Sequence, residues 1–156
     1  MTDLDIIQRV AALFEIKYVC TTKAKRENWK DSYTIVLKGK RAIRIMNELY
    51  PLMGWRRKQQ IEDAIGYQPI TEYEPTEEDW FHWLAGLLEG EGSFMKGTPS
   101  KPQIPRIHLK MTDKDIIERV ANIFQASYYG PYKTKPKKSE SVYKPHYIVW
   151  SYGKRG

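Results

Sequence analysis

The sequence predicts an α+β fold, and three observations support this class. Apolar residues recur at helical spacing in several segments, most clearly in residues 114–124. Other segments are short, aromatic and β-branched, as in Tyr147–Ser151, which is typical of strands. A pattern of one helix followed by two strands occurs twice along the chain. Helices mixed with antiparallel hairpins are therefore expected.

The repeat is visible in the residues themselves. The segment MTDLDIIQRVAALF begins at Met1 and matches MTDKDIIERVANIF, which begins at Met111, at ten of fourteen positions. Further along, YTIVLKGKRA from Tyr33 corresponds to YIVWSYGKRG from Tyr147. Residues 1–42 therefore recur approximately as 111–156, and the segment between them occurs once.

Each copy is expected to open with an amphipathic helix. Thr112 and Asp115 are predicted to form a capping pair, which Thr2 and Asp5 repeat. The apolar positions that follow in the two copies are Ile6, Ile7, Val10, Ala11 and Phe14, and Ile116, Ile117, Val120, Ala121, Ile123 and Phe124. Each helix is followed by a predicted hairpin, with strands at 18–21 and 33–37, and at 128–133 and 147–151.

The segment between the copies predicts further elements. Helices are expected at 41–49 and 56–65, and a linker containing Pro and Glu at 68–75. A hairpin is expected from about 92 to 110.

One more helix is expected before that hairpin. Thr76 can cap it, and Glu77, Glu78 and Asp79 place negative charge in its first turn. The helix is expected to end at Gly92, which places Glu91 in the last turn beside carbonyls that have no partner within the helix.

Small residues interrupt the apolar surface of this helix. Gly86 and Gly90 lie four apart, so one stripe of the surface lacks side chains and a second helix could approach closely. A carboxylate such as Glu91 beside unpaired carbonyls is an oxygen-rich site for a hard divalent cation.

Composition narrows the class of partner. The chain has 26 Lys and Arg against 19 Asp and Glu, a net charge of +7, which favours a polyanion such as nucleic acid. Cys20 is the single cysteine, which argues against a disulfide framework and a cysteine zinc site. The sequence shows neither a long apolar run nor a signal-peptide pattern, so a cytoplasmic or nucleoid-associated protein without a membrane span is expected.

The run LAGLLEGEGSF from Leu84 to Phe94 resembles the signature of the LAGLIDADG homing endonucleases. The resemblance implies an αββαββα unit with a curved antiparallel DNA-binding sheet. Compared with that order of helices and strands, the chain is circularly permuted or consists of two incomplete half-units. Residues 1–66 contain a second half with closing helices, 67–75 a linker, and 76–156 the signature helix with both hairpins but no closing helices.

Three arrangements are compatible with this order. Residues 1–110 could close on themselves, leaving the last 46 residues to find a partner. Two incomplete lobes could instead complement another chain by swapping. The chain could also be a fragment of a longer gene. A bare truncation would expose large apolar faces, so a homo-oligomer is expected.

The resemblance also implies an active site. Glu91 would bind Mg²⁺ or another divalent cation, with the carbonyl of Gly90 as a further ligand. Arg56 and Asp113 would line the catalytic pocket. Two signature helices would pair, so a dimer is implied, and the helix interface would contain Leu84, Ala85, Gly86, Leu87 and Gly90.

A DNA-binding surface is expected on the strands. Arg106, His108 and Lys110 alternate with apolar residues, so one face of this strand would enter the core and the other could face a major groove. The expected surface also includes Lys96, Lys144, His146 and the loop residues Lys133, Lys135, Lys137 and Lys138.

The leading hypothesis is thus a homing endonuclease that hydrolyses double-stranded DNA. The alternatives are a DNA- or RNA-binding relative that does not cleave, either maturase-like or regulatory, and an inactive remnant of a mobile element. At residue level, Glu91 could be only a solvated helix-end carboxylate. The tryptophans Trp55, Trp80, Trp83 and Trp150 are expected in the core or an interface rather than as base-stacking groups.

Overall fold

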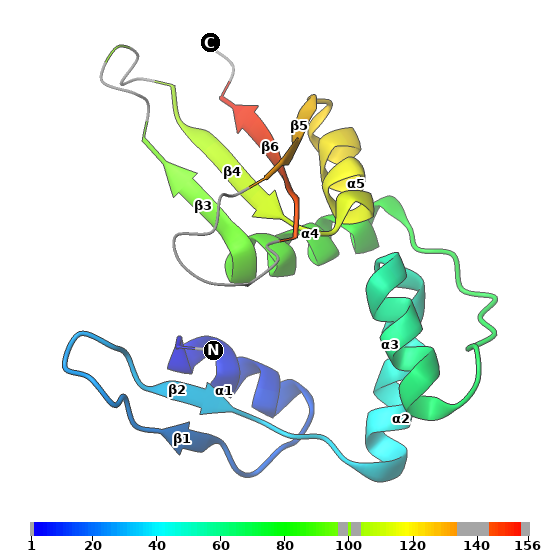
Figure 1. The fold of residues 1–156 in the computed structure, drawn as a ribbon. Coiled ribbons are helices and arrows are strands. Elements are labelled where there is room, and N and C mark those ends of the chain that lie inside the picture. Colours follow the sequence, from blue (N-terminus) through cyan, green and yellow to red (C-terminus); the bar gives the residue numbers. More distant parts are fainter. Residues whose placement is uncertain (1, 97–99, 101–103, 134–143, 154–156) are drawn as a thin grey trace. The chain divides into compact units, whose positions relative to one another are not determined.

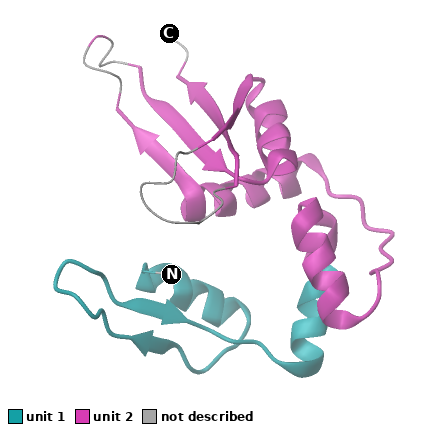
Figure 2. Cartoon of the chain, in the orientation of Figure 1, with its two compact units in different colours: residues 1–48 teal, residues 49–156 magenta. Residues whose placement is uncertain are grey.

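The computed structural model describes residues 2–96, 100, 104–133 and 144–153. It confirms the α+β class, with helices and two antiparallel sheets (Figure 1). The contacts divide the chain into two compact units, residues 1–48 and 49–156 (Figure 2). No helix in the described part is long and apolar enough to cross a membrane.

Unit 1 contains the first copy of the repeat. Helix α1 spans Leu4–Leu13 and buries Ile7 and Ala11. Strands β1 (Cys20–Thr22) and β2 (Ser32–Thr34) pair antiparallel, as the hairpin prediction required. Helix α2 (Gly39–Leu49) then begins close to the position expected from the sequence.

Unit 2 opens with the turn η1 (Tyr50–Leu52) and helix α3 (Trp55–Ile65). Helix α4 (Glu77–Glu91) leads directly into β3 (Gly92–Met95). The remaining elements are β4 (Arg106–Met111), α5 (Lys114–Phe124), β5 (Tyr128–Tyr132) and β6 (His146–Tyr152).

The sheet of unit 2 has the strand order β3-β4-β6-β5, and all neighbours are antiparallel. Leu109 and Val149 pair across β4 and β6 and are fully buried against α4 and α5. The fully buried Ile117 and Val120 of α5 belong to the same core. One face of the sheet is therefore covered by two helices.

Helix α4 begins and ends where the sequence indicates. The Thr76 side chain accepts the backbone N–H of Asp79, and the Asp79 carboxylate accepts the backbone N–H of Thr76, which completes a capping box. Hydrogen bonds donated to the Asp79 carboxylate by the Thr76 hydroxyl, the Tyr73 side chain and the Thr76 backbone N–H lower the pKa of Asp79 to about 2. At the other end, a Cβ on Gly92 would lie 2.5 Å from the Leu88 carbonyl oxygen, so only glycine fits this close approach.

The predicted capping pair of the second copy is wrong. Helix α5 has Asp113 as its N-cap, without a side-chain capping bond. The Asp115 carboxylate instead accepts the backbone N–H of Trp55, at 2.7 Å. The first copy also lacks the predicted cap, since the N-cap of α1 is Asp3, with no side-chain capping bond. The repeated acids are therefore not used to cap their own helices.

The division into units differs from the one expected from the repeat. The repeat gave boundaries after residues 66 and 75, whereas the contacts divide the chain between Glu48 and Leu49. Segment 50–56 binds α5 of the second copy. Within unit 2, the segment before and at the start of α3 therefore belongs with the second copy of the repeat. The assignment of 1–66 and 76–156 to half-units stays a prediction.

Candidate active site and nucleic-acid surface

A pocket of about 640 Å³ lies at the end of the sheet where β4 leads into α5. It is lined by Glu91 of α4, Arg56 of α3 and Asp113 of α5. These are the three residues that the sequence analysis assigned to catalysis, and they come from segments far apart in the chain. The full set of polar or charged lining residues is Arg56, Arg57, Glu91, Lys110, Thr112, Asp113 and His146.

Asp113 and Arg56 form an ion pair in this pocket. The guanidinium donates from Nε to one carboxylate oxygen at 2.8 Å and from Nη2 to the other at 2.7 Å. Hydrogen bonding from Arg56 lowers the pKa of Asp113 and raises that of Arg56. Both oxygens of Asp113 are thus used within the chain, which favours a role in positioning Arg56 over a role as ligand or base.

Glu91 is differently placed. It is the last residue of α4, it is exposed, and among the described residues its side chain has no hydrogen-bond partner or ion pair. The carboxylate is therefore free to bind a ligand. Helix C-terminal carbonyls next to it carry partial negative charge, which favours a cation at this position.

The groups around Glu91 offer few ligands to a divalent cation. Within the described residues, no group of three or more His, Cys, Asp or Glu side chains could hold a metal ion. One carboxylate and one main-chain carbonyl, those of Glu91 and Gly90, fit Mg²⁺ as part of a site, since Mg²⁺ takes few protein ligands and keeps water or phosphate oxygens. Gly90 is exposed but does not line the pocket with Glu91.

The predicted helix interface separates into two parts. Leu84 is 6% exposed and packs in the core of unit 2. Because the sheet covers this side chain, Leu84 cannot contact a second helix, and the prediction that it lies in the helix interface is wrong. Leu87 is half-buried at the pocket. Ala85, Gly86 and Gly90 are exposed, and an added Cβ on either glycine would meet no atom within 4 Å.

The alternation in β4 is confirmed. Ile107 and Leu109 pack toward the core, while Arg106, His108 and Lys110 lie on the other face. No helix of unit 2 covers that second face in the described part of the chain (Figure 1).

Trp150, which was expected in the core or an interface, is half-buried on the face of the sheet that carries His108, and so lies outside the core. It pairs with His108 across β6 and β4, and the two rings stack with centroids 4.0 Å apart. The Arg106 guanidinium lies 4.9 Å from the Trp150 ring centroid. The alternation of β6 around buried Val149 could have placed Trp150 on the open face from sequence alone. Burial, together with the charges of Arg106 and Lys110, lowers the pKa of His108.

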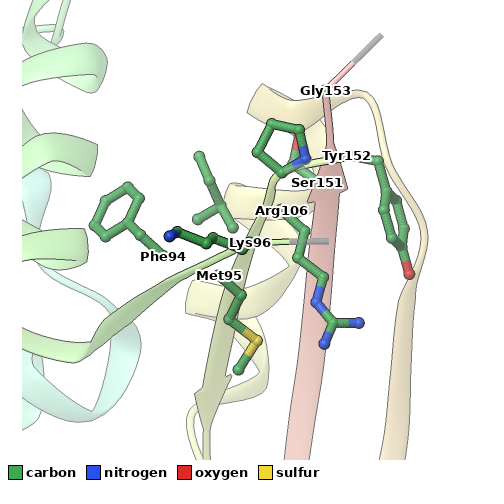
Figure 3. Close-up of a pocket in the computed structure, with 9 residues that line it drawn as sticks. Phe94, Met95, Lys96, Arg106, Ser151, Tyr152 and Gly153 are labelled. Carbon is green, nitrogen blue, oxygen red and sulfur yellow. The ribbon is translucent and has the colours of Figure 1, made fainter. Parts of the chain in front are cut away.

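A second pocket, of about 510 Å³, lies at the opposite end of the same strands (Figure 3). Lys96, Arg106 and Tyr152 are among its lining residues. The Nε atom of Arg106 is buried without a hydrogen-bond partner in the described part of the chain. The two pockets therefore mark the two ends of a basic and aromatic strip on the sheet.

The other predicted contact residues are more scattered. His146 is half-buried at the start of β6 and lines the pocket of Glu91, and its ring lies 5.6 Å from that of Tyr132. Lys133 and Lys144 are exposed beyond the ends of β5 and β6. Lys135, Lys137 and Lys138 lie outside the described residues.

Arg119 is a residue that the sequence analysis missed. Its guanidinium lies over the rings of Trp80 and Trp83, at 4.4 and 4.9 Å from the centroids. It also donates a hydrogen bond from Nη1 to the Leu52 carbonyl, at 2.8 Å. Arg119 therefore joins α5, α4 and the segment before α3. Its identity with Arg9 in the repeat was the available signal.

The chain was also compared with known proteins. Neither the protein-family models nor the curated proteins gave a match.

Proposed function

We propose that the chain is a LAGLIDADG-type endonuclease that binds double-stranded DNA and hydrolyses its phosphodiester bonds with Mg²⁺. The observation that carries the proposal is the shared pocket of Glu91, Arg56 and Asp113. The three residues were assigned from separate parts of the sequence, and their convergence at one end of a basic strand supports a common role.

The charges of the pocket suit a phosphodiester. Arg56, Arg57 and Lys110 outnumber the carboxylates Glu91 and Asp113, and Arg56 already neutralises Asp113. The Arg56 Nη1 atom has no partner among the described residues and is available to a phosphate oxygen. Bound at Glu91, a divalent cation would polarise the phosphate and lower the pKa of an attacking water.

A dimer through α4 is part of the proposal. Gly86 and Gly90 each cost a helix roughly 1 kcal/mol relative to Ala, and no contact within unit 2 requires either glycine. Close approach of a second α4 helix would explain why glycine occupies both positions. It would also bring a second Glu91 carboxylate to complete the cation site.

Cleavage of a randomised duplex library with Mg²⁺ tests the endonuclease. The wild-type protein is expected to cut a subset of sequences, and Glu91→Gln to bind them without cutting. Glu89→Gln is the matched control, because Glu89 is an exposed carboxylate of the same helix that does not line the pocket. Absence of cutting by the wild type, or equal cutting by Glu91→Gln, would reject the assignment.

A non-cleaving nucleic-acid binder is the second candidate. The observation that favours it is that one chain offers a single unpaired carboxylate in the pocket, since Asp113 is held by Arg56. Binding that weakens steeply with salt, without metal-dependent nicking, would select this function.

A further inference from the structure

Segment 50–56 is held on α5 by two acids at the start of that helix. The Asp113 carboxylate receives both hydrogen bonds from Arg56. The Asp115 carboxylate accepts the backbone N–H of Trp55 at 2.7 Å, which satisfies a free donor in the first turn of α3. Both contacts are charge-assisted, so they are stronger than ordinary neutral hydrogen bonds.

Two further contacts fix the position of the segment. Arg119 donates to the Leu52 carbonyl at 2.8 Å. Gly54 is buried against Ile116, and a Cβ on Gly54 would lie 2.5 Å from the Ile116 Cδ1 atom. The segment therefore fits α5 through one carbonyl, one glycine, one N–H and one guanidinium.

The first copy of the repeat contains the same binding residues. Each of the four α5 residues has an identical residue 110 positions earlier, in or just before α1. These residues are Asp3, Asp5, Ile6 and Arg9. Both helices have the N-cap at the equivalent aspartate, in extended conformation and without a side-chain capping bond, so the four side chains share one backbone framework.

These residues at α1 do not make the hydrogen bonds and packing contacts that their counterparts at α5 make with segment 50–56. Asp3, Asp5 and Arg9 are exposed, and among the described residues their side chains make no hydrogen bond or ion pair. Ile6 is only partly buried, whereas Ile116 is 7% exposed beneath Gly54. The acids are also not needed as helix caps.

We propose that α1 is a docking surface for a helix-opening segment of the type Leu-x-Gly-aromatic-Arg, supplied by a second polypeptide. The numbers of surfaces and segments in one chain indicate that the segment bound at α1 comes from a different polypeptide. Each chain has two such surfaces but one segment of this type, Leu52–Arg56, which already occupies α5. A second copy could fill α1 only by vacating its own α5, with no net gain of contacts. The inference does not depend on nuclease activity.

Titration of the full chain with a labelled peptide of residues 49–66 tests the surface. One peptide is expected to bind per chain. Asp5→Asn and Arg9→Gln should each weaken binding about tenfold or more, because each removes a charge-assisted hydrogen bond. Gln8→Ala is the matched control and should bind normally, since the equivalent Glu118 does not contact the segment.

A Gly54→Ala peptide is a second control. It should bind poorly, because its Cβ would overlap Ile6 as it would overlap Ile116 in the chain's own contact. Circular dichroism of each chain variant separates lost binding from lost folding, and Asp5→Asn and Arg9→Gln replace exposed side chains.

Three results would overturn the proposal. The wild-type chain could fail to bind the peptide. Binding could resist the α1 variants yet be lost on Asp115→Asn, which would mean that the peptide displaces the chain's own segment from α5. Self-association could abolish peptide binding as chain concentration rises and depend on Asp5, which would make a second copy the occupant.

Discussion

Arg56 and Asp113 form a two-bond ion pair between residues 57 positions apart in the chain, with nitrogen to oxygen distances of 2.8 and 2.7 Å. The Asp113 side chain is 12% exposed and that of Arg56 is 40% exposed. The pair therefore connects the first turn of α3 to the start of α5 from a partly shielded position. It also orients a guanidinium toward the pocket of Glu91.

Replacement of Arg56 by Lys should destabilise unit 2. A lysine ammonium cannot form two parallel hydrogen bonds to one carboxylate. We expect the free energy of unfolding to fall by about 1 kcal/mol, a value reduced for the partial exposure of Arg56. Urea denaturation measures it. Arg57→Lys is the control, since Arg57 is an exposed residue of the same helix. Equal losses in the two variants would contradict a specific role for the pair.

The same pair predicts a pH dependence of stability. The pKa of Asp113 is lowered in the folded chain, so its contribution is complete above the ordinary aspartate pKa of about 3.9. It is lost as the pH falls through the lower folded value. Asp113→Asn should therefore be less stable than wild type at pH 7, and the difference should shrink below about pH 4. A difference that stays constant down to pH 2 would disagree with this linkage.

Gly86→Ala should separate folding from assembly. No atom lies within 4 Å of the added Cβ, and alanine favours a helix by roughly 1 kcal/mol over glycine, so the folded chain should keep or gain thermal stability. The dimer proposed through α4 should dissociate, because the methyl group would hold the second α4 helix away. Sedimentation equilibrium measures the molar mass. A Gly86→Ala dimer as tight as wild type would remove this helix from the interface.

Replacement of Arg106 should change the titration of His108. Burial lowers the pKa of His108, and the positive charges of Arg106 and Lys110 lower it further. Arg106→Gln removes one of these charges, so the pKa should rise toward the ordinary value of about 6.5. NMR titration of the imidazole measures it. Lys144→Gln is the control, since no effect of Lys144 on His108 is resolved. An unchanged pKa in Arg106→Gln would mean that the Arg106 charge does not act on His108.

The sequence predicted the local elements well where local rules decide them. Thr76 and Asp79 cap α4 through residues three apart, and Gly92 ends the helix where its backbone meets Leu88. The alternation around Leu109 placed the two faces of β4 correctly. Each of these features depends on neighbours within a few residues.

Features set by distant contacts were not predictable in the same way. Asp115 resembles a capping residue, but Trp55, 60 positions away, uses its carboxylate. The choice of the second copy over the first as the partner of segment 50–56 also depends on tertiary contacts, because the two copies have identical residues at the contact. Sequence alone left those alternatives open.

The direct passage from α4 to β3 has a mechanical consequence. Glu91 is the last residue of the helix and Gly92 the first of the strand, so no hinge residue separates the carboxylate from the sheet. Gly92 is in turn paired with Leu109 in the middle of the core. A ligand that bends or tilts the sheet must therefore move Glu91 as well. Any distortion of β3 thus changes the position of the Glu91 carboxylate.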